Sequence, residues 1–159
     1  NIDAPVEAVW PWLAQMGRDR TGWYSFDFID NNGIPSATYI RKDLAEPQVG
    51  MELDQGLKIL DVQSGRLLLF GADDVPLPLG ASMDLTMLYY LERKSDGSSR
   101  LLVRMRGHAY GLTGRIVKYA FEIADFVMGI RQAQGIKARA ETMAHLNIAV
   151  PLEHEISLN

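Results

Sequence analysis

The feature that most limits the fold of this chain is a pair of long alternating segments within residues 81–110. Apolar and polar side chains alternate along residues 83–92 and again along residues 101–110. A period of two is typical of β-strands with one buried face. The sequence Ser-Asp-Gly-Ser at residues 95–98 lies between them and favours a hairpin turn. We therefore expect two long, adjacent antiparallel strands whose apolar side chains lie on the same face of the sheet.

Helical spacing of apolar residues predicts helices on both sides of these strands. One covers about residues 4–16 with Asp3 as its N-cap, and a short one follows Ser25, which is placed to cap it. A longer helical pattern runs over residues 112–144. A straight helix of that length would extend about 50 Å, against an expected radius of gyration of about 15 Å. We therefore expect a break near residues 122–125.

The segment between the first helices and the long strands is less regular. Residues 33–50 lack a clear period and predict a loop, whereas residues 57–62 and 66–70 predict two strands around a tight turn. Residues 71–80 contain two prolines and predict a rigid loop. Helices, an antiparallel meander and a long final helix make the expected class α+β.

Composition excludes several classes of function. The chain has 159 residues, 47% of them hydrophobic, no cysteine and a net charge of -4. Disulfides, zinc-thiolate sites and cysteine nucleophiles are therefore excluded, and the acidic balance disfavours nucleic acid as a partner. No apolar run is long enough to span a membrane. We expect one domain over residues 1–146, an extended or disordered tail over 147–159, a cytoplasmic location, and a monomer or weak homodimer.

The sequence carries no recognisable catalytic or cofactor motif. It lacks the patterns of a serine nucleophile elbow, a zinc protease helix and a phosphate-binding loop. His108, His145 and His154 have no metal-binding spacing, so we expect neither a metal nor a cofactor. The feature that does indicate a function is the apolar face of the predicted hairpin, which is rich in methionine and favours a binding site. Methionine side chains suit adaptable binding surfaces.

Five segments together resemble one protein superfamily. They are residues 2–13 (IDAPVEAVWPWL), 15–17 (QMG), 22–27 (GWYSFD), 125–128 (DFVM) and 135–137 (GIK). The chain resembles the bacterial START-like proteins, also called the SRPBCC or polyketide cyclase/dehydrase-type superfamily. The resemblance implies a helix-grip fold, in which a curved antiparallel sheet wraps a long C-terminal helix around a hydrophobic cavity. It supplies no set of catalytic residues.

One departure from that family concerns the start of the chain. Family members have a complete strand before the Asp-Ala-Pro turn, and only Asn1 and Ile2 precede that turn here. Either the chain is trimmed or one edge of the sheet is open. An open edge favours pairing with another chain.

The leading hypothesis is a binding module for a small hydrophobic molecule, such as a lipid or a polyketide-like compound. The ligand would lie between the sheet and the last helix. The expected site has an aromatic end, a floor on the two long strands and a roof on the helix, formed by Trp23, Tyr24, Met83, Leu85, Met87, Tyr89, Met105, Ile123, Val127 and Ile130.

Two alternatives remain open at this point. A cyclase, aromatase or dehydratase-type enzyme would use the same cavity, with Tyr24, Asp27 and Tyr89 as candidates for acid, base or hydrogen-bond donor. A buried Asp27 with a raised pKa would favour the enzyme. A protein-interaction domain would instead show a filled core and an exposed apolar patch.

Overall fold

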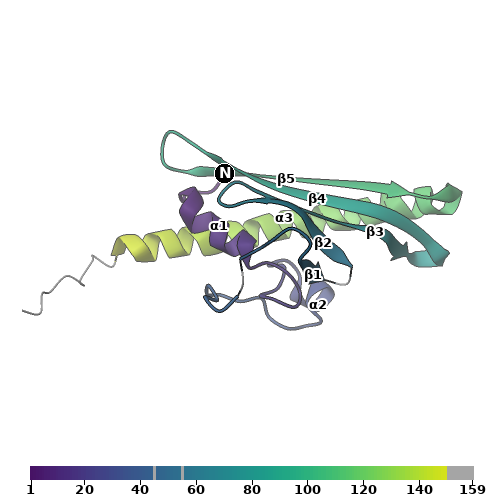
Figure 1. Ribbon diagram of the computed structural model, residues 1–159, viewed down its shortest axis with the longest axis horizontal. Helices are drawn as coiled ribbons and strands as arrows, with labels where there is room; N and C mark the ends of the chain where they lie inside the picture. Colours follow the sequence, from purple (N-terminus) through teal and green to yellow (C-terminus); the bar gives the residue numbers. More distant parts are fainter. Residues whose placement is uncertain (45, 55, 150–159) are drawn as a thin grey trace, which may run out of the picture.

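The computed structural model describes residues 1–44, 46–54 and 56–149. Two short helices, α1 (Val6–Ala14) and α2 (Asp27–Asp30), precede a five-stranded antiparallel sheet, and the long helix α3 (Gly111–Ala149) follows it. The strands are β1 (Glu52–Asp54), β2 (Leu57–Gln63), β3 (Leu67–Leu77), β4 (Ala81–Arg93) and β5 (Ser99–Ala109), with a 3-10 turn η1 (Pro78–Gly80) between β3 and β4. Figure 1 shows the sheet bending over α3. The predicted α+β class is confirmed.

The sheet is a simple meander in which each strand pairs with the next along the chain. The hairpin of β4 and β5 has an unbroken register from Met83 opposite Ala109 to Arg93 opposite Ser99. This confirms the two long strands and the turn that the alternation predicted. The sheet is not closed, because β1 and β5 lie at opposite edges of the strand order.

β3 is longer than the sequence indicated. Residues 71–77 were expected in a loop, but they continue the strand. The pairing of β2 with β3 ends where Lys58 lies opposite Gly71, and β3 then pairs with β4 alone. Pro76 lies in this section, opposite Ser82. A proline has no N–H to donate, and it is tolerated in a strand section that has no neighbour on one side.

The main core lies between the sheet, α1 and the second half of α3. Val9 and Leu13 from α1 meet Ile136 of α3 in one buried cluster. The sheet contributes Leu53, Ile59, Leu68, Phe70, Tyr89 and Leu91 to the same cluster. Burial of these apolar side chains supplies most of the stabilising free energy. The core is therefore concentrated at one end of the long helix.

Both predicted side-chain caps are wrong. α1 begins after Pro5 without a side-chain cap, and the backbone N–H of Asp3 donates to Glu141 Oε1 at 2.7 Å. α2 begins after Phe26, and the Ser25 hydroxyl donates to the carbonyl oxygen of Met128 at 3.0 Å. In both places a contact with α3 replaces the local cap. Such long-range contacts are not visible in local sequence patterns.

The expected break in the last helix near residues 122–125 is also wrong, because α3 is continuous. The long strands explain why most of this helix can lie along the sheet. A strand of 13 residues, the length of β4, extends roughly 43 Å at about 3.3 Å per residue. The first half of α3 runs beside the beginning of β4 and the end of β5 (Figure 1). A fold elongated in this way accommodates a longer rod than a spherical domain would.

The end of α3 bears on the predicted tail. Residues 147–149 belong to α3, and the rest of the expected tail, residues 150–159, lies outside the described residues. Within the part of the chain that the structure describes, no helix combines the length and the apolar character needed to cross a bilayer.

Candidate functional site

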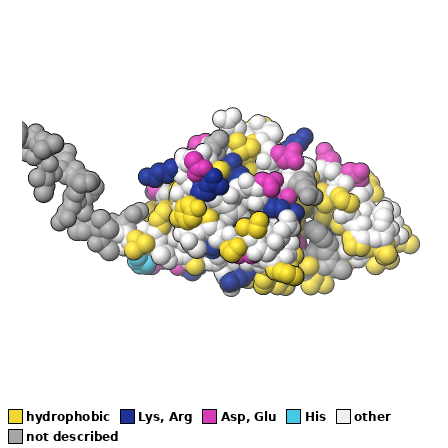
Figure 2. Space-filling model, turned by 90° about the horizontal axis from the view of Figure 1, so that it is seen from below, with side chains coloured by type: hydrophobic (Ala, Val, Ile, Leu, Met, Phe, Trp, Pro, Cys, Tyr) yellow, Lys and Arg dark blue, Asp and Glu magenta, His cyan; other side chains and the backbone are white. Residues whose placement is uncertain are grey.

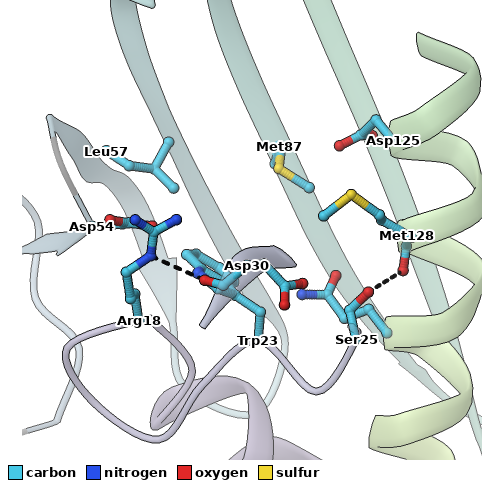
Figure 3. Close-up of a pocket in the computed structure, with 11 residues that line it drawn as sticks. Arg18, Trp23, Ser25, Asp30, Asp54, Leu57, Met87, Asp125 and Met128 are labelled. Carbon is cyan, nitrogen blue, oxygen red and sulfur yellow. Dashed lines mark hydrogen bonds and ion pairs between the residues drawn. The ribbon is translucent and has the colours of Figure 1, made fainter. Parts of the chain in front are cut away.

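A pocket opens between the sheet, α3 and the loop that joins α1 to α2 (Figure 3). We call it the Trp23 pocket. Its cavity volume is about 160 Å³. An apolar cavity of about 150 Å³ is large enough for benzene. The lining residues come from the loop, α2, β1, β2, β4 and α3, and they are Arg18, Trp23, Ser25, Asp30, Asp54, Leu57, Met87, Asp125, Met128, Gly129 and Gln132.

Apolar side chains form much of the wall. In Figure 3 the thioethers of Met87 from β4 and Met128 from α3 point toward one another. The indole of Trp23 is anchored against Phe70, with ring centroids 5.7 Å apart, and Phe70 stacks on Tyr89 at 5.4 Å. This row of aromatic rings fixes one wall on the sheet. Two flexible thioethers give the rest of the wall an adaptable shape.

The α3 side of the pocket has an unusual composition for a helix face against a sheet. Asp125, Gly129 and Gln132 all face the cavity. A Cβ added at Gly129 would meet no atom within 4 Å. The Gln132 side chain is held in place, because its Oε1 accepts a hydrogen bond from the Tyr89 hydroxyl and its Nε2 lies 3.4 Å from the sulfur of Met16. The absence of a side chain at Gly129 leaves part of the cavity open.

The opposite wall contains an ion pair. Arg18 Nε lies 3.2 Å from Asp54 Oδ2 and donates to the backbone carbonyl oxygen of Asp30 at 3.0 Å. The carboxylate of Asp30 is a separate group, and its Oδ1 has no hydrogen-bond partner among the described residues. The Arg18 guanidinium thus offsets the charge of Asp54 and not that of Asp30.

Two carboxyl groups of the pocket have shifted pKa values. Burial raises the pKa of Asp30, although hydrogen bonds from its own backbone and from Ser25 act in the opposite direction. Burial alone raises the pKa of Asp125. A carboxylate that loses water without gaining a cation becomes harder to ionise. Such shifts are common at functional sites.

The structure places two of the predicted ligand-binding residues, Trp23 and Met87, in this pocket. Met83 and Tyr89 are buried in the protein interior, and Tyr89 reaches the pocket only through its bond to Gln132. Leu85 and Met105 line a different hollow of about 550 Å³ near the far end of the sheet, with a larger share of polar wall. The strand residues predicted to form the floor of one site therefore do not lie together. One of them lines the Trp23 pocket, two line the other hollow, and the rest belong to the core.

The predicted roof is not formed by the expected helix residues. Ile123, Val127 and Ile130 are 70%, 50% and 45% exposed. The helix turns the face with Asp125 and Gln132 toward the cavity instead. Helical periodicity shows that apolar residues share a face, but it does not indicate whether that face meets the sheet.

Tyr24 and Asp27, two of the three weak catalytic candidates, lie outside the Trp23 pocket. The Tyr24 hydroxyl is buried with Gln15 Nε2 at 2.9 Å and Thr21 Oγ1 at 2.7 Å, and burial raises its pKa. Asp27 accepts hydrogen bonds from Ser36 and Asn31. Partial burial opposes ionisation of Asp27, but these bonds hold its pKa below the usual value. Both side chains stabilise the loop, and neither is placed to meet a ligand in the pocket.

The third candidate, Tyr89, is fully buried. Burial and the charge of Asp125 raise its pKa far above the usual value, so its hydroxyl stays protonated at neutral pH. Among the described residues, its hydroxyl has one polar partner, Gln132. Tyr89 is therefore placed to orient a pocket residue.

The polar residues of the pocket were missed by sequence reasoning. Arg18, Asp30 and Asp54 come from a loop, a short helix and a short strand whose relative positions no local pattern predicts. Asp125 and Gln132 lie seven residues apart, which is a two-turn spacing on one helix face. That spacing was the one available signal. Among the described residues, no group of three or more histidine or acidic side chains is arranged to hold a metal ion.

Comparison with known proteins gave no match, whether against protein-family models, curated proteins or solved structures.

Proposed function

We propose that this protein binds a small hydrophobic molecule in the Trp23 pocket. The observation that carries the proposal is the cavity of about 160 Å³ between the sheet and α3, with Trp23, Leu57, Met87 and Met128 in its wall. Concave, mainly apolar sites with a few polar groups are typical of small-molecule binding. The resemblance to START-like proteins supports the same position for a ligand.

The size of the cavity favours a particular kind of ligand. Its volume corresponds to a single aromatic ring with a short substituent. It is smaller than the roughly 300–1,000 Å³ of sites that enclose drug-sized molecules. We therefore propose a compact aromatic or branched aliphatic ligand in preference to a complete lipid.

The second candidate is an enzyme of cyclase or dehydratase type that uses this cavity. Asp27, its best candidate from the sequence, lies outside the pocket and has a lowered pKa. The observation that keeps the enzyme under consideration is the raised pKa of Asp30 and of Asp125 inside the pocket. Turnover of a co-purifying molecule, lost in Asp125→Asn, would favour the enzyme.

Gly129 offers a direct test of binding. Native mass spectrometry of gently purified protein should show a bound small molecule. Benzyl alcohol, added as a neutral probe, should raise the Tm, because a ligand that binds only the folded state stabilises it. Gly129→Leu should fill the cavity and remove both effects. Its fold should persist, since replacing glycine within a helix favours the helix by about 1 kcal/mol.

Gln134→Leu is the matched control, because it adds the same side chain to an exposed position of α3 outside the pocket. This variant should bind the probe like the wild type. Circular dichroism would establish that both variants are folded. Equal binding of benzyl alcohol by folded Gly129→Leu and by the wild type would refute the proposed site.

A further inference from the structure

Asp30 is the first reason to look beyond a purely apolar ligand. It ends α2, it is only 8% exposed, and it lines the Trp23 pocket. Its Oδ1 has no hydrogen-bond partner among the described residues. A buried acceptor without a partner is destabilising, and more so when it is charged. The neighbouring guanidinium of Arg18 is bound to Asp54 and to the backbone oxygen of Asp30.

Asp125 faces the same space from the opposite wall. Its carboxylate points from α3 toward Met87 (Figure 3). In the part of the chain that the structure describes, it has no hydrogen bond or ion pair. Burial raises the pKa of both Asp30 and Asp125, as expected for carboxylates without a compensating cation. Two acceptors on opposite walls therefore lack a positively charged partner.

The net charge of the pocket walls also favours a cationic ligand. Its walls hold the carboxylates of Asp30, Asp54 and Asp125 against the single guanidinium of Arg18. This balance attracts a cation and repels an anion. Trp23 adds an aromatic ring, and aromatic rings attract organic cations. The apolar side chains of Leu57, Met87 and Met128 in the same wall suit the carbon atoms of an organic cation.

We infer that the ligand of the Trp23 pocket carries a positively charged nitrogen, which binds to Asp30 and Asp125 while the rest of the ligand lies among the apolar side chains. The ligand class is thus a compact aryl or alkyl amine in its protonated form. This inference rests on the proposed function, since it names the chemistry of a ligand for the same pocket.

Three probes of similar size separate charge from shape. Calorimetric titration at neutral pH would compare benzylamine, which is a cation, with neutral benzyl alcohol and anionic benzoate. Benzylamine should bind at least about tenfold more tightly than benzyl alcohol, which is the effect expected of hydrogen bonds to a charged group. Benzoate should bind most weakly.

Variants then assign the effect to the two carboxylates. Asp30→Asn and Asp125→Asn should each remove most of the preference for benzylamine while retaining benzyl alcohol. Asp61→Asn, on β2 and outside the pocket, should keep the wild-type preference. Circular dichroism would show that each variant is folded.

The outcomes distinguish this inference from the proposed function. If benzyl alcohol binds the wild type as tightly as benzylamine, the charged ligand is refuted and the hydrophobic pocket remains. If the preference persists in both Asn variants, the assignment to Asp30 and Asp125 is refuted. If no probe binds at millimolar concentration, both the inference and the proposed function are refuted.

Discussion

Gly135 lies where α3 packs tightly against Tyr24, in the loop that carries Trp23. A Cβ at this position would lie 2.2 Å from the carbonyl oxygen of Tyr24 and 3.1 Å from its Cβ. Both are atoms that no side-chain rotation can move away. The helix therefore approaches the loop closely only because residue 135 has no side chain.

Gly135→Ala should accordingly destabilise the fold by about 1–3 kcal/mol, the usual effect of overpacking. Urea denaturation would measure the change. Gly129→Ala is the matched control in the same helix, since its added Cβ meets no atom within 4 Å. It should leave stability unchanged or raise it by up to about 1 kcal/mol. An equally stable Gly135→Ala would contradict the close approach.

The raised pKa of Asp125 makes a prediction about pH. Around its titration the folded protein binds more protons than the unfolded chain, so this group lowers the free energy of unfolding as pH rises. The effect begins near the ordinary aspartate value of 3.8 and is complete above the raised value in the fold. Asp125→Asn should therefore gain stability relative to the wild type between acidic and neutral pH in urea denaturation.

Asp27 should change the free energy of unfolding with pH in the opposite direction to Asp125. Its pKa is lowered in the fold, despite partial burial, by bonds from Ser36 and Asn31. Its contribution to stability is present above the unfolded value of 3.8 and is lost as pH falls through the lower folded value. Asp27→Asn should be less stable than the wild type at neutral pH and should approach it in acid. Parallel trends for the two variants would contradict these assignments.

At the residue scale, two of the side chains predicted to meet a ligand, Trp23 and Met87, line the Trp23 pocket. Trp23 was predicted from a dense group of aromatic residues that suits a cavity wall, and Met87 from the apolar face of an alternating strand. Asp30 and Asp125 were not predicted, because acidic residues on helices usually face water. In the fold Asp30 is buried and Asp125 is half-buried.

At the scale of elements, the two halves of α3 differ in burial. Ile136, Ala140 and Ala144 are buried in the second half. Over residues 115–130, no described side chain of the helix is buried. Local opening is easier where few side chains are packed. The first half should therefore open more readily than the second, although both belong to one helix.

Hydrogen exchange measured by mass spectrometry or NMR would test this difference. Amides of residues 115–124 should exchange faster than those of residues 132–144, in the order set by side-chain burial. The central amides of β4, which pair on both sides, provide an internal reference for full protection. Uniform protection along α3 would contradict the expected difference.

Physical reasons explain why the sequence predicted β4 and β5 but not the second part of β3. The period of two predicted β4 and β5 because successive side chains of a strand point to opposite faces. The contrast in burial is weaker than the contrast in sequence, since β4 is half-buried on both faces over most of its length and β5 is mostly half-buried or exposed. Pro76 and Pro78 indicated a loop, since a proline inside a sheet usually removes a hydrogen bond. That rule does not apply to the section of β3 that pairs with β4 alone. Whether a strand has a neighbour on one side or on both depends on the tertiary structure. The local sequence therefore could not show that residues 71–77 continue β3.

At the scale of the whole molecule, apolar surface is distributed unevenly. Figure 2 shows hydrophobic side chains gathered at the end of the molecule where α3 begins. The exposed residues there include Leu112, Ile116, Tyr119, Ile123 and Phe126. The other end holds the core. Several exposed apolar side chains on one stretch of helix favour the binding of hydrophobic dyes.

The folded protein should therefore increase the fluorescence of the dye ANS. Replacing Ile123 and Phe126 by Lys should reduce this signal and change the free energy of unfolding by no more than about 0.5 kcal/mol, because both positions are exposed. A double variant with Lys at Thr113 and Gln134, which are exposed and polar, is the control for added charge. An unchanged signal in the Ile123 and Phe126 variant would show that the dye binds elsewhere.

The continuity of α3 has a mechanical consequence. The residues that close the pocket and the residues that anchor the core belong to the same rod, without a proline or other interruption between Asp125 and Ala144. The N-terminal end of this rod is attached as well, because only Tyr110 separates α3 from β5, and its backbone N–H donates to Ser82 O at 3.2 Å. The α3 wall of the Trp23 pocket is therefore held from both sides, by the core beyond Gln132 and by the junction with β5 before Leu112.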